Sequence, residues 1–344
     1  MDKIILVVDD DRTNLIMAEK LLSEEYRVIL VSSGAQALRY LEKKRADLIL
    51  LDINMPQMDG FEVMRTIKEN DAWSKIPVIF LTADKDTATE VECLKMGAVD
   101  FVGKPFEPEI IRNRIRRTLE IEEYRKDLEG AVRRQTAKID RIQHELIIGL
   151  ANLIESRDGS TGAHVKRTSQ YVELIVEELR NRGMYETIIT DDYVYNLVKA
   201  APMHDIGKIA VPDNVLQKPG RLTEEEFEVM KRHAAEGGKI IRSIMGGIEE
   251  PYYIQIASDV ASFHHEKWNG EGYPSGISGE NIPLGARIMA VADVFDALIS
   301  KRCYKEAMPV DKAFQIIEES AGEHFDPQIA KVFLDLRQQI ESYI

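Results

Sequence analysis

Five of the seven histidines in this 344-residue sequence belong to one set between positions 164 and 293 that also includes two aspartates. The candidate metal ligands are His164, His204, Asp205, His233, His264, His265 and Asp293. Neutral imidazoles and carboxylates without a thiolate are the ligand set of a hydrolytic divalent-metal site. Any one of these histidines alone would more often be a hydrogen-bonded core or surface residue, so the prediction depends on the whole set.

The adjacent pair His204–Asp205 suggests how two metals could share these ligands. Consecutive side chains on a helix point about 100° apart, so the histidine could bind one metal while the carboxylate spans two. One metal could be held by His164, His204 and Asp293, and the other by His233, His264 and His265. Two metals about 3.5–4 Å apart would activate a shared water for in-line attack on phosphorus.

Three basic residues could supply the positive charge that a phosphate needs. Lys208 lies four residues after His204, so on a helix its ammonium would project beside the metals. Arg302 and Lys305 lie where the end of a later helix could return toward the site. A solvated helix face is the alternative for Lys208. Asp205 and Lys208 are the predicted catalytic pair.

The stretch "HHEKWNGEGYP" follows the paired histidines with a glycine-rich loop. Gly272 would permit a tight turn and Pro274 would fix it, which would hold Tyr273 rigidly over the mouth of the site. These three residues are predicted to bind the substrate.

A second constellation lies in the first third of the sequence. Five short apolar runs, in "KIILVVDD", "RVILVSS", "ADLILLDI", "IPVIFLTA" and "DFVGKP", alternate with amphipathic stretches, which predicts a five-stranded, doubly wound parallel sheet. Such sheets place functional groups at the carboxyl ends of their strands, where Asp9, Asp10 and Asp52 fall. Carboxylates gathered there suit Mg²⁺, and Asp52 could attack a phosphoryl group. Lys104 could reach the phosphoryl oxygens, and the Thr82 hydroxyl could follow the phosphate.

A long helix is predicted between the two constellations, from about residue 107 to 152. Its apolar stripe recurs at steps of three or four residues and comprises Ile121, Tyr124, Leu128, Val132, Gln135, Ile139, Ile142 and Leu146. Such a stripe is typical of a parallel two-stranded coiled coil; the alternative is an amphipathic helix lying on its own domain. Beyond it the chain reads as helices joined by loops. The predicted organisation is a domain at 1–120, a linking helix at 121–146 and an all-α domain at 147–344.

Composition and charge restrict the class of protein. A 344-residue chain with 44% hydrophobic and 30% charged residues is long enough for two or three globular domains. A net charge of −14 argues against a broad electrostatic contact with nucleic acid or anionic lipid. The acidic start "MDKIILVVDD" is unlike a signal peptide, and no apolar run reaches the ~18 residues of a membrane helix. Two cysteines, Cys93 and Cys303, fit a reducing compartment. We therefore expect a cytoplasmic protein.

The first 120 residues resemble a response-regulator receiver domain, which has a flavodoxin-like fold. The resemblance is carried by "VVDDD", "LLDINMP", "FLTA" and "GKPF", in that order and spacing. It implies that Asp52 is the phosphoacceptor and that a sensor histidine kinase is a partner. The other implied residues are the Mg²⁺ ligands Asp10, Asp52 and the Asn54 carbonyl, with Asp9 acting through water, the switch pair Thr82 and Phe101, and the phosphate-reading Lys104. A flavodoxin-like domain with incidental acids is the alternative.

Residues from about 147 to 340 resemble the HD-GYP family of metal-dependent phosphodiesterases. The strings "HDIGKIAVPDNVLQKPGRLT" and "HHEKWNGEGYPSGISGENIPLGARIMAVADVFDAL" carry this resemblance. It implies hydrolysis of cyclic di-GMP to pGpG, or further to GMP. Tyr273 would contact the guanine-bearing ligand, and Lys208, Arg302 and Lys305 its phosphates. Asp296 would shape the substrate pocket or support the metal ligands.

The sequence departs from the family pattern at a few positions. Asn269, Ile299 and Cys303 replace the usual aspartate, threonine and proline; none is a proposed ligand, so tuning of activity is expected rather than loss. Some members bind a third metal through a glutamate four residues before the first histidine. Ser160 occupies that position here, and Glu155 lies too far upstream to be an obvious replacement. Two metals are therefore expected. Fe or Mn is favoured, and Ni or Zn also suits the ligands.

These features predict a response regulator that hydrolyses cyclic di-GMP under the control of Asp52 phosphorylation. The expected partners are cyclic di-GMP, a sensor histidine kinase, a second copy bound through the linking helix, and diguanylate cyclase-type proteins. Nucleic acid and membrane insertion are not expected. A hydrolase of another cyclic dinucleotide or of a nucleoside phosphate is an alternative. A further alternative is a module that binds the ligand, or recruits partner proteins, without turnover.

Overall fold

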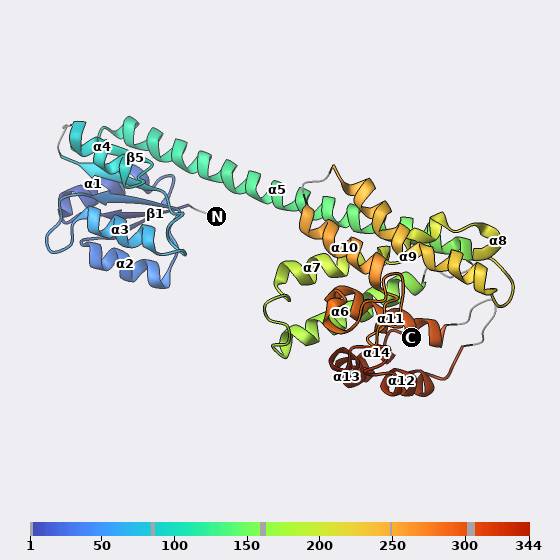
Figure 1. Ribbon diagram of the computed structural model, residues 1–344. Helices are drawn as coiled ribbons and strands as arrows, with labels where there is room; N and C mark the ends of the chain where they lie inside the picture. The colour runs from blue at the N-terminus through green and yellow to red at the C-terminus, as the bar shows by residue number, and fades with distance from the viewer. Residues whose placement is uncertain (1–2, 84–86, 159–162, 248–249, 301–306) are drawn as a thin grey trace. The chain divides into compact units, whose positions relative to one another are not determined.

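The computed structural model describes residues 3–83, 87–158, 163–247, 250–300 and 307–344. The chain divides into two compact units, Met1–Thr136 and Ala137–Ile344. One long helix, α5 (Pro108–Glu155), contributes to both units (Figure 1).

The first unit is built on a five-stranded parallel sheet with the strand order β2-β1-β3-β4-β5. The strands are β1 (Ile4–Val8), β2 (Arg27–Val31), β3 (Leu48–Asp52), β4 (Val78–Thr82) and β5 (Asp100–Gly103). Every residue of β3 and β4 is buried, as expected for central strands covered by helices on both faces. The predicted doubly wound sheet is confirmed.

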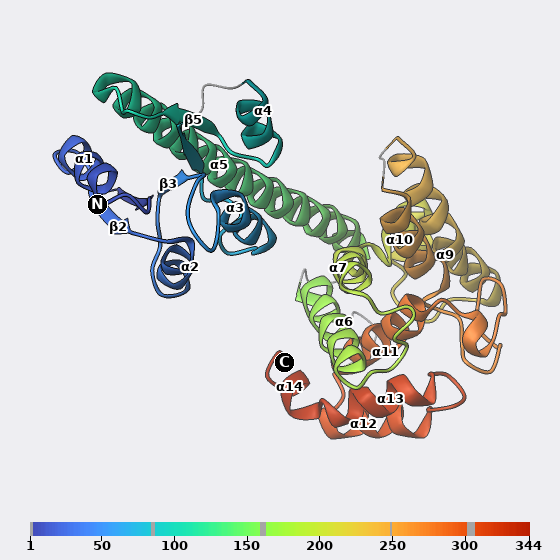
Figure 2. The same ribbon diagram turned by 90° about the vertical axis from the view of Figure 1, so that its left-hand side faces the viewer.

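Helices cover both faces of this sheet (Figure 1 and Figure 2). One face packs against α2 (Gly34–Lys43), α3 (Gly60–Glu69) and Cys93 of α4 (Thr87–Lys95). The other face packs against α1 (Arg12–Leu22) and the first turns of α5. Both layers hold the sheet so that the ends of β1, β3 and β4 meet at one edge.

Helix α5 is 48 residues long, so it extends beyond both ends of the predicted linking helix. Its first turns bury Ile111, Ile115 and Leu119 in the core of the first unit. Its last turns bury Ala151 and Ile154 in the second unit. Between these ends the apolar stripe is exposed; its large members are Ile121, Tyr124, Leu128, Val132, Ile139, Ile142 and Leu146.

The second unit is helical, which confirms the all-α prediction. Among its described residues, β pairing is limited to one isolated bridge, between Ala321 and Phe325. Its α-helices are α6 (Ala163–Asn181), α7 (Asp191–Ala200), α8 (Asp213–Leu216), α9 (Glu224–Met245), α10 (Pro251–Phe263), α11 (Leu284–Ile299), α12 (Val310–Glu319), α13 (Pro327–Asp335) and α14 (Arg337–Glu341). The short 3₁₀ turns are η1 (Ser156–Asp158), η2 (Ala201–Met203), η3 (Ile206–Ala210) and η4 (Gly279–Asn281).

The core of the second unit contains an aromatic cluster. Phe295 of α11 contacts the rings of Tyr171, Phe314 and Phe333, with centroid distances of 4.7–5.7 Å. This cluster joins α6, α11, α12 and α13; in Figure 2, α12 and α13 are drawn below α6 and α11. The predicted ligands lie on α6, α9 and α11, in the turn between η2 and η3, and directly after α10.

None of the helices described is both long enough and apolar enough to span a bilayer.

Candidate functional site

The first unit brings its predicted acidic residues together at the carboxyl edge of the sheet. Asp9 directly follows β1 and Asp52 ends β3. The Lys104 ammonium lies 2.7 Å from Asp9 Oδ2 and 2.8 Å from Asp52 Oδ1. Carboxylate oxygens of Asp9, Asp10 and Asp52 all lie within 4.8 Å of one another. Hard oxygen donors at this spacing suit a hard cation such as Mg²⁺.

Electrostatics in this cluster favour a second cation beside Lys104. Burial raises the pKa of Asp52, although the hydrogen bond from Lys104 opposes the rise. Burial also disfavours the Lys104 ammonium, but its bonds to Asp52 and Asp9 outweigh that effect and raise its pKa. Lys104 is therefore charged at neutral pH and neutralises only part of the acidic cluster.

The other predicted residues of this cluster lie around the same edge. Asp10 and Asn54 are exposed, so a solvent-borne ion can reach them. Thr82 is buried at the end of β4. Phe101 is half-buried on β5, with the Arg114 guanidinium 5.5 Å from its ring centroid.

The second unit collects all seven of its predicted ligands in one buried cluster. One set of ligand atoms within 4.8 Å of one another comes from Asp205, His233, His264 and His265; another comes from Glu155, His164, His204 and Asp205. Asp205 belongs to both sets. Asp293 Oδ1 lies 3.5 Å from His164 Nε2 and 3.9 Å from His204 Nε2, which places it beside the second set.

Backbone carbonyls orient three of these imidazoles. The Nδ1 atoms of His204, His233 and His264 lie 2.7–3.1 Å from carbonyl oxygens of Ala201, of Met230, and of Val260 and Ala261. An Nδ1–H that donates to a carbonyl leaves the Nε2 lone pair free to bind a metal.

The Nε2 atoms themselves are the evidence that a cation belongs here. Within the described residues, the buried Nε2 atoms of His164, His204, His233 and His264 have no hydrogen-bond partner. Buried polar atoms normally find such partners. Four orphaned nitrogen atoms that face carboxylates are therefore an arrangement that divalent metal ions fit.

The pKa shifts describe the same cluster. Burial lowers the pKa of His233 to about 4, so this imidazole is neutral at physiological pH and can act as a ligand. Burial also disfavours the charged form of His204, but Asp205, Asp293 and Glu155 outweigh it and raise its pKa to about 9. The half of the site around His204 thus carries excess negative charge, which attracts cations.

The geometry corrects the prediction that His204 and Lys208 share a helical face. The 3₁₀ turn η2 ends at Met203 and is capped by His204, and η3 begins directly after Asp205. A 3₁₀ turn has three residues, so positions i and i+3 eclipse. Lys208 therefore lies over Asp205, with its ammonium 2.7 Å from Asp205 Oδ2.

The loop after the paired histidines lies against the cluster. The Tyr273 ring is 4.8 Å from the His265 ring, and its backbone N–H donates to the His265 carbonyl at 3.2 Å. Gly272 passes so close to the chain that a Cβ there would lie 2.3 Å from the Lys267 nitrogen. The Tyr273–Pro274 peptide bond is cis. Glycine is therefore required at position 272 because the chain packs closely there, and not because the backbone adopts an unusual angle.

Asp296 lies behind the ligands instead of at the mouth of the site. It is fully buried, and its Oδ2 lies 2.7 Å from His164 Nδ1. The Arg167 guanidinium donates to both of its oxygens, at 2.5 and 2.9 Å. This geometry favours orientation of His164 over the other expected role, contact with the substrate.

Glu155 is the residue that sequence reasoning set aside. The spacing expected for a glutamate ligand pointed to position 160, yet the Glu155 carboxylate lies 3.5 Å from His164 Nε2 and is 2% exposed. Burial raises its pKa. A sequence signal for it is an acid within the apolar run "ANLIES", where a solvated glutamate is not expected.

Some sequence predictions fall outside this cluster or outside the described residues. Arg302, Lys305, Cys303 and Ser160 lie outside the described residues. Asn269 is exposed, and its Oδ1 accepts from the Glu271 N–H at 2.9 Å, so its role in the structure is to shape the loop.

Comparison with known proteins identifies both units. Residues 5–116 match the response regulator receiver domain, and residues 150–329 match the HD domain. A Vibrio cholerae protein named a probable cyclic di-GMP phosphodiesterase is 41% identical over 340 residues, 96% of this chain and 77% of that protein. The Xanthomonas campestris cyclic di-GMP phosphodiesterase response regulator RpfG is 36% identical over 98% of this chain and 88% of its own.

A third relative also matches nearly the whole chain. The Thermotoga maritima cyclic di-GMP phosphodiesterase is 34% identical over 98% of this chain and 91% of its own. The similarity therefore spans both units and the helix that joins them. The chain belongs to the family of response regulators that join a receiver domain to an HD domain.

Proposed function

We propose that this chain hydrolyses cyclic di-GMP at a dinuclear metal site in its HD domain, under the control of phosphorylation at Asp52. The observation that carries the proposal is the pair of buried ligand sets that share Asp205. Relatives named as cyclic di-GMP phosphodiesterases, 34–41% identical over nearly the whole chain, support the substrate.

The residues divide into two metal sites. One cation would be held by His164, His204 and Asp293, and the other by His233, His264 and His265, with Asp205 between them. When bound there, two cations would supply Lewis-acid chemistry, lowering the pKa of a bound water and neutralising charge on the leaving oxygen. A thiolate-free set accepts Fe or Mn, which we favour, as well as Ni or Zn.

The residues around the metal ligands would contact the phosphates and bases of the substrate. The ammonium of Lys208, held against Asp205, presents positive charge where a phosphate would approach. Tyr273 packs against His265 and lies near Phe227, with ring centroids 6.2 Å apart. Its ring can therefore support a guanine base by stacking. We assign phosphate contacts also to Arg302 and Lys305.

The receiver domain supplies the control. Asp52 accepts a phosphoryl group from a sensor histidine kinase, with Mg²⁺ held by Asp10, Asp52 and the Asn54 carbonyl. Before phosphorylation, the Lys104 ammonium is paired with the Asp52 carboxylate. Once Asp52 is phosphorylated, the same ammonium can bind a phosphoryl oxygen instead. Thr82 and Phe101 would respond to that change as the switch pair.

Turnover of cyclic di-GMP by the purified chain tests this function. Protein loaded with Fe or Mn under reducing, anaerobic conditions should release pGpG or GMP, and His204→Ala should bind less metal and lose turnover. Metal content and product formation are measured on the same samples, with and without acetyl phosphate. Tight binding of cyclic di-GMP without turnover in the loaded wild type would support the alternative, a ligand-binding module.

Helix α5 is the proposed dimer interface. Its stripe leaves Leu128 65% exposed and Tyr124 76% exposed, and a repeat of three and four residues can pair with a second copy of itself. We expect Leu128→Glu to weaken self-association at least tenfold in analytical ultracentrifugation, with and without a phosphoryl mimic. Ala137→Glu, which adds the same charge on the opposite helical face, should leave it unchanged. A monomeric wild type would contradict the proposal.

A further inference from the structure

Helix α5 ends inside the cluster of candidate metal ligands in the HD domain. Its last residue, Glu155, is 2% exposed. Its Oε1 lies 3.5 Å from His164 Nε2 and 3.9 Å from the Lys208 ammonium. Neither of its carboxylate oxygens has a hydrogen-bond partner among the described residues. A buried carboxylate without hydrogen bonds is costly unless a positive charge compensates it.

The spacing of the surrounding donors fits a shared ion. His164 Nε2 lies 3.5 Å from Glu155 Oε1 and 3.5 Å from Asp293 Oδ1. Two ligand atoms bound to one metal at about 2.1 Å lie roughly 3.0–3.5 Å apart. His164 is itself held through its Nδ1 by Asp296, so its Nε2 faces Glu155 and Asp293 in a fixed orientation.

We propose that Glu155 is a direct ligand of the metal bound by His164 and His204, and that it ties the position of α5 to the occupancy of that metal site. The inference rests on the proposed dinuclear centre and keeps two cations. It gives one cation a carboxylate from the helix that also contributes to the receiver domain.

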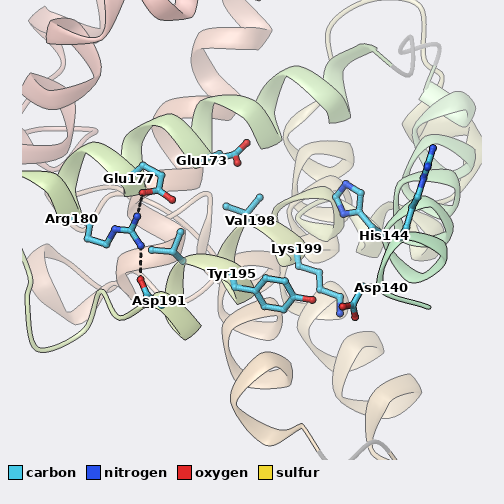
Figure 3. A pocket seen from close by; sticks show the side chains of 11 residues that line it. Asp140, His144, Glu173, Glu177, Arg180, Asp191, Tyr195, Val198 and Lys199 are labelled. Atoms are coloured by element: carbon cyan, nitrogen blue, oxygen red, sulfur yellow. Dashed lines mark hydrogen bonds and ion pairs between the residues drawn. The ribbon is translucent and has the colours of Figure 1, made fainter. Parts of the chain in front are cut away.

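Helix α5 makes few contacts within the HD unit before its last turns. Ile147, Ala151 and Ile154 pack against the unit, and Gln143 Oε1 accepts a hydrogen bond from the Lys199 ammonium of α7 at 3.2 Å. Two to three turns before Ala151, a cleft of about 490 Å³ lies between α5 and the helices α6 and α7. Figure 3 shows Asp140 and His144 of α5 at one side of this cleft, and Glu177 of α6 and Tyr195 of α7 facing it from the others.

The cleft has a consequence for coupling. Because this cleft lies along the helix, a shift of α5 there has few contacts to break, among them the Lys199–Gln143 hydrogen bond, and its end would carry Glu155 toward or away from the metal. Because linkage is reciprocal, a signal that shifts α5 must then change the affinity for metal.

Manganese binding by the full-length chain tests the ligand. Metal-free protein is titrated with Mn²⁺, and free Mn²⁺ is followed by electron paramagnetic resonance. With excess Mg²⁺ present to occupy the receiver site, the wild type should bind two Mn²⁺ ions tightly. Glu155→Gln should weaken one of them at least tenfold, since loss of an outer-shell partner alone costs 10–100-fold. Glu145→Gln, an exposed position on the same helix, should bind like the wild type.

Thermal melting separates a ligand from a structural carboxylate. Metal-free Glu155→Gln should melt at the wild-type temperature or above, because the substitution removes a buried charge, while the gain in melting temperature on adding Mn²⁺ should shrink. Two ions bound with wild-type affinities by Glu155→Gln would overturn the assignment. If the wild type failed to hydrolyse cyclic di-GMP, the proposed function would be refuted. The Mn²⁺ titration would still show whether Glu155 binds a metal ion.

The coupling is tested with beryllofluoride, a phosphoryl mimic. It should change the Mn²⁺ affinity of the wild type at least threefold and have a smaller effect in Glu155→Gln. A change of the same size in both proteins, or no change in either, would overturn the coupling.

Discussion

Replacing Asp205 by asparagine should remove both metals and lower the turnover of cyclic di-GMP at least about a thousandfold. Asp205 is the residue common to both ligand sets, with His233 Nε2 3.3 Å from its Oδ1 and His204 Nε2 3.5 Å from its Oδ2. The asparagine keeps the shape of the side chain and loses the charge that two cations would share. Loss of an outer-shell partner alone costs 10–100-fold, so loss of a shared ligand should cost more.

The measurement is metal content by mass spectrometry, together with product formation at saturating substrate. Asp192→Asn, an exposed aspartate of α7, removes the same charge away from the site and should change neither. Circular dichroism checks that both variants are folded. Asp205→Asn protein that kept two metals per chain and turnover within tenfold of the wild type would refute the role of Asp205.

The fold was largely predictable because its signals are local. The apolar run of β3, flanked by polar residues, reads as a buried strand from its own composition, and all five of its residues are buried. The stripe through Leu128 and Val132 likewise predicts one long helix from spacing alone. Neither inference requires knowledge of which segments meet.

The sequence predicted which residues form the candidate site better than it predicted how their side chains are arranged. Residue types alone selected His164, His204 and His233, which the structure brings together. The Lys208 ammonium lies beside the ligands as predicted, but it aligns with Asp205 rather than with His204, because two 3₁₀ turns replace the assumed α-helix there. No periodic pattern of side chains distinguishes such short turns in sequence.

Glu155 shows a second limit. Asp296, whose contact with His164 spans 132 residues, was selected in advance as a possible support for the metal ligands, whereas Glu155, on the helix that precedes α6, was set aside. A spacing rule measured along the chain from His164 could not find Glu155, because η1 and the residues after it intervene between α5 and α6. Where a chain turns between helices determines which acid reaches the metal.

Close backbone packing around Gly207 leads to the second prediction, a large loss of stability in Gly207→Ala. A Cβ at this position would lie 1.9 Å from the carbonyl oxygen of His233 and 2.6 Å from the Gly237 nitrogen. Both obstacles are backbone atoms of α9, so no side chain can rotate away. Overpacking typically costs about 1–3 kcal/mol, and a backbone clash belongs at the upper end.

For a unit of this size, a loss of about 3 kcal/mol lowers the melting temperature by roughly 6–12 °C. The experiment is thermal unfolding of the metal-free chain, so that lost stability is not confused with lost metal. Gly149→Ala is the matched control, because nothing lies within 4 Å of its added Cβ and alanine favours a helix; its melting temperature should stay level or rise slightly. Since Gly207 sits between Asp205 and Lys208, the displaced turn should also bind metal less tightly. A Gly207→Ala protein that melted within 2 °C of the wild type would mean that η3 and α9 can separate freely, and Asp205 could not then be held between the two ligand sets by this contact.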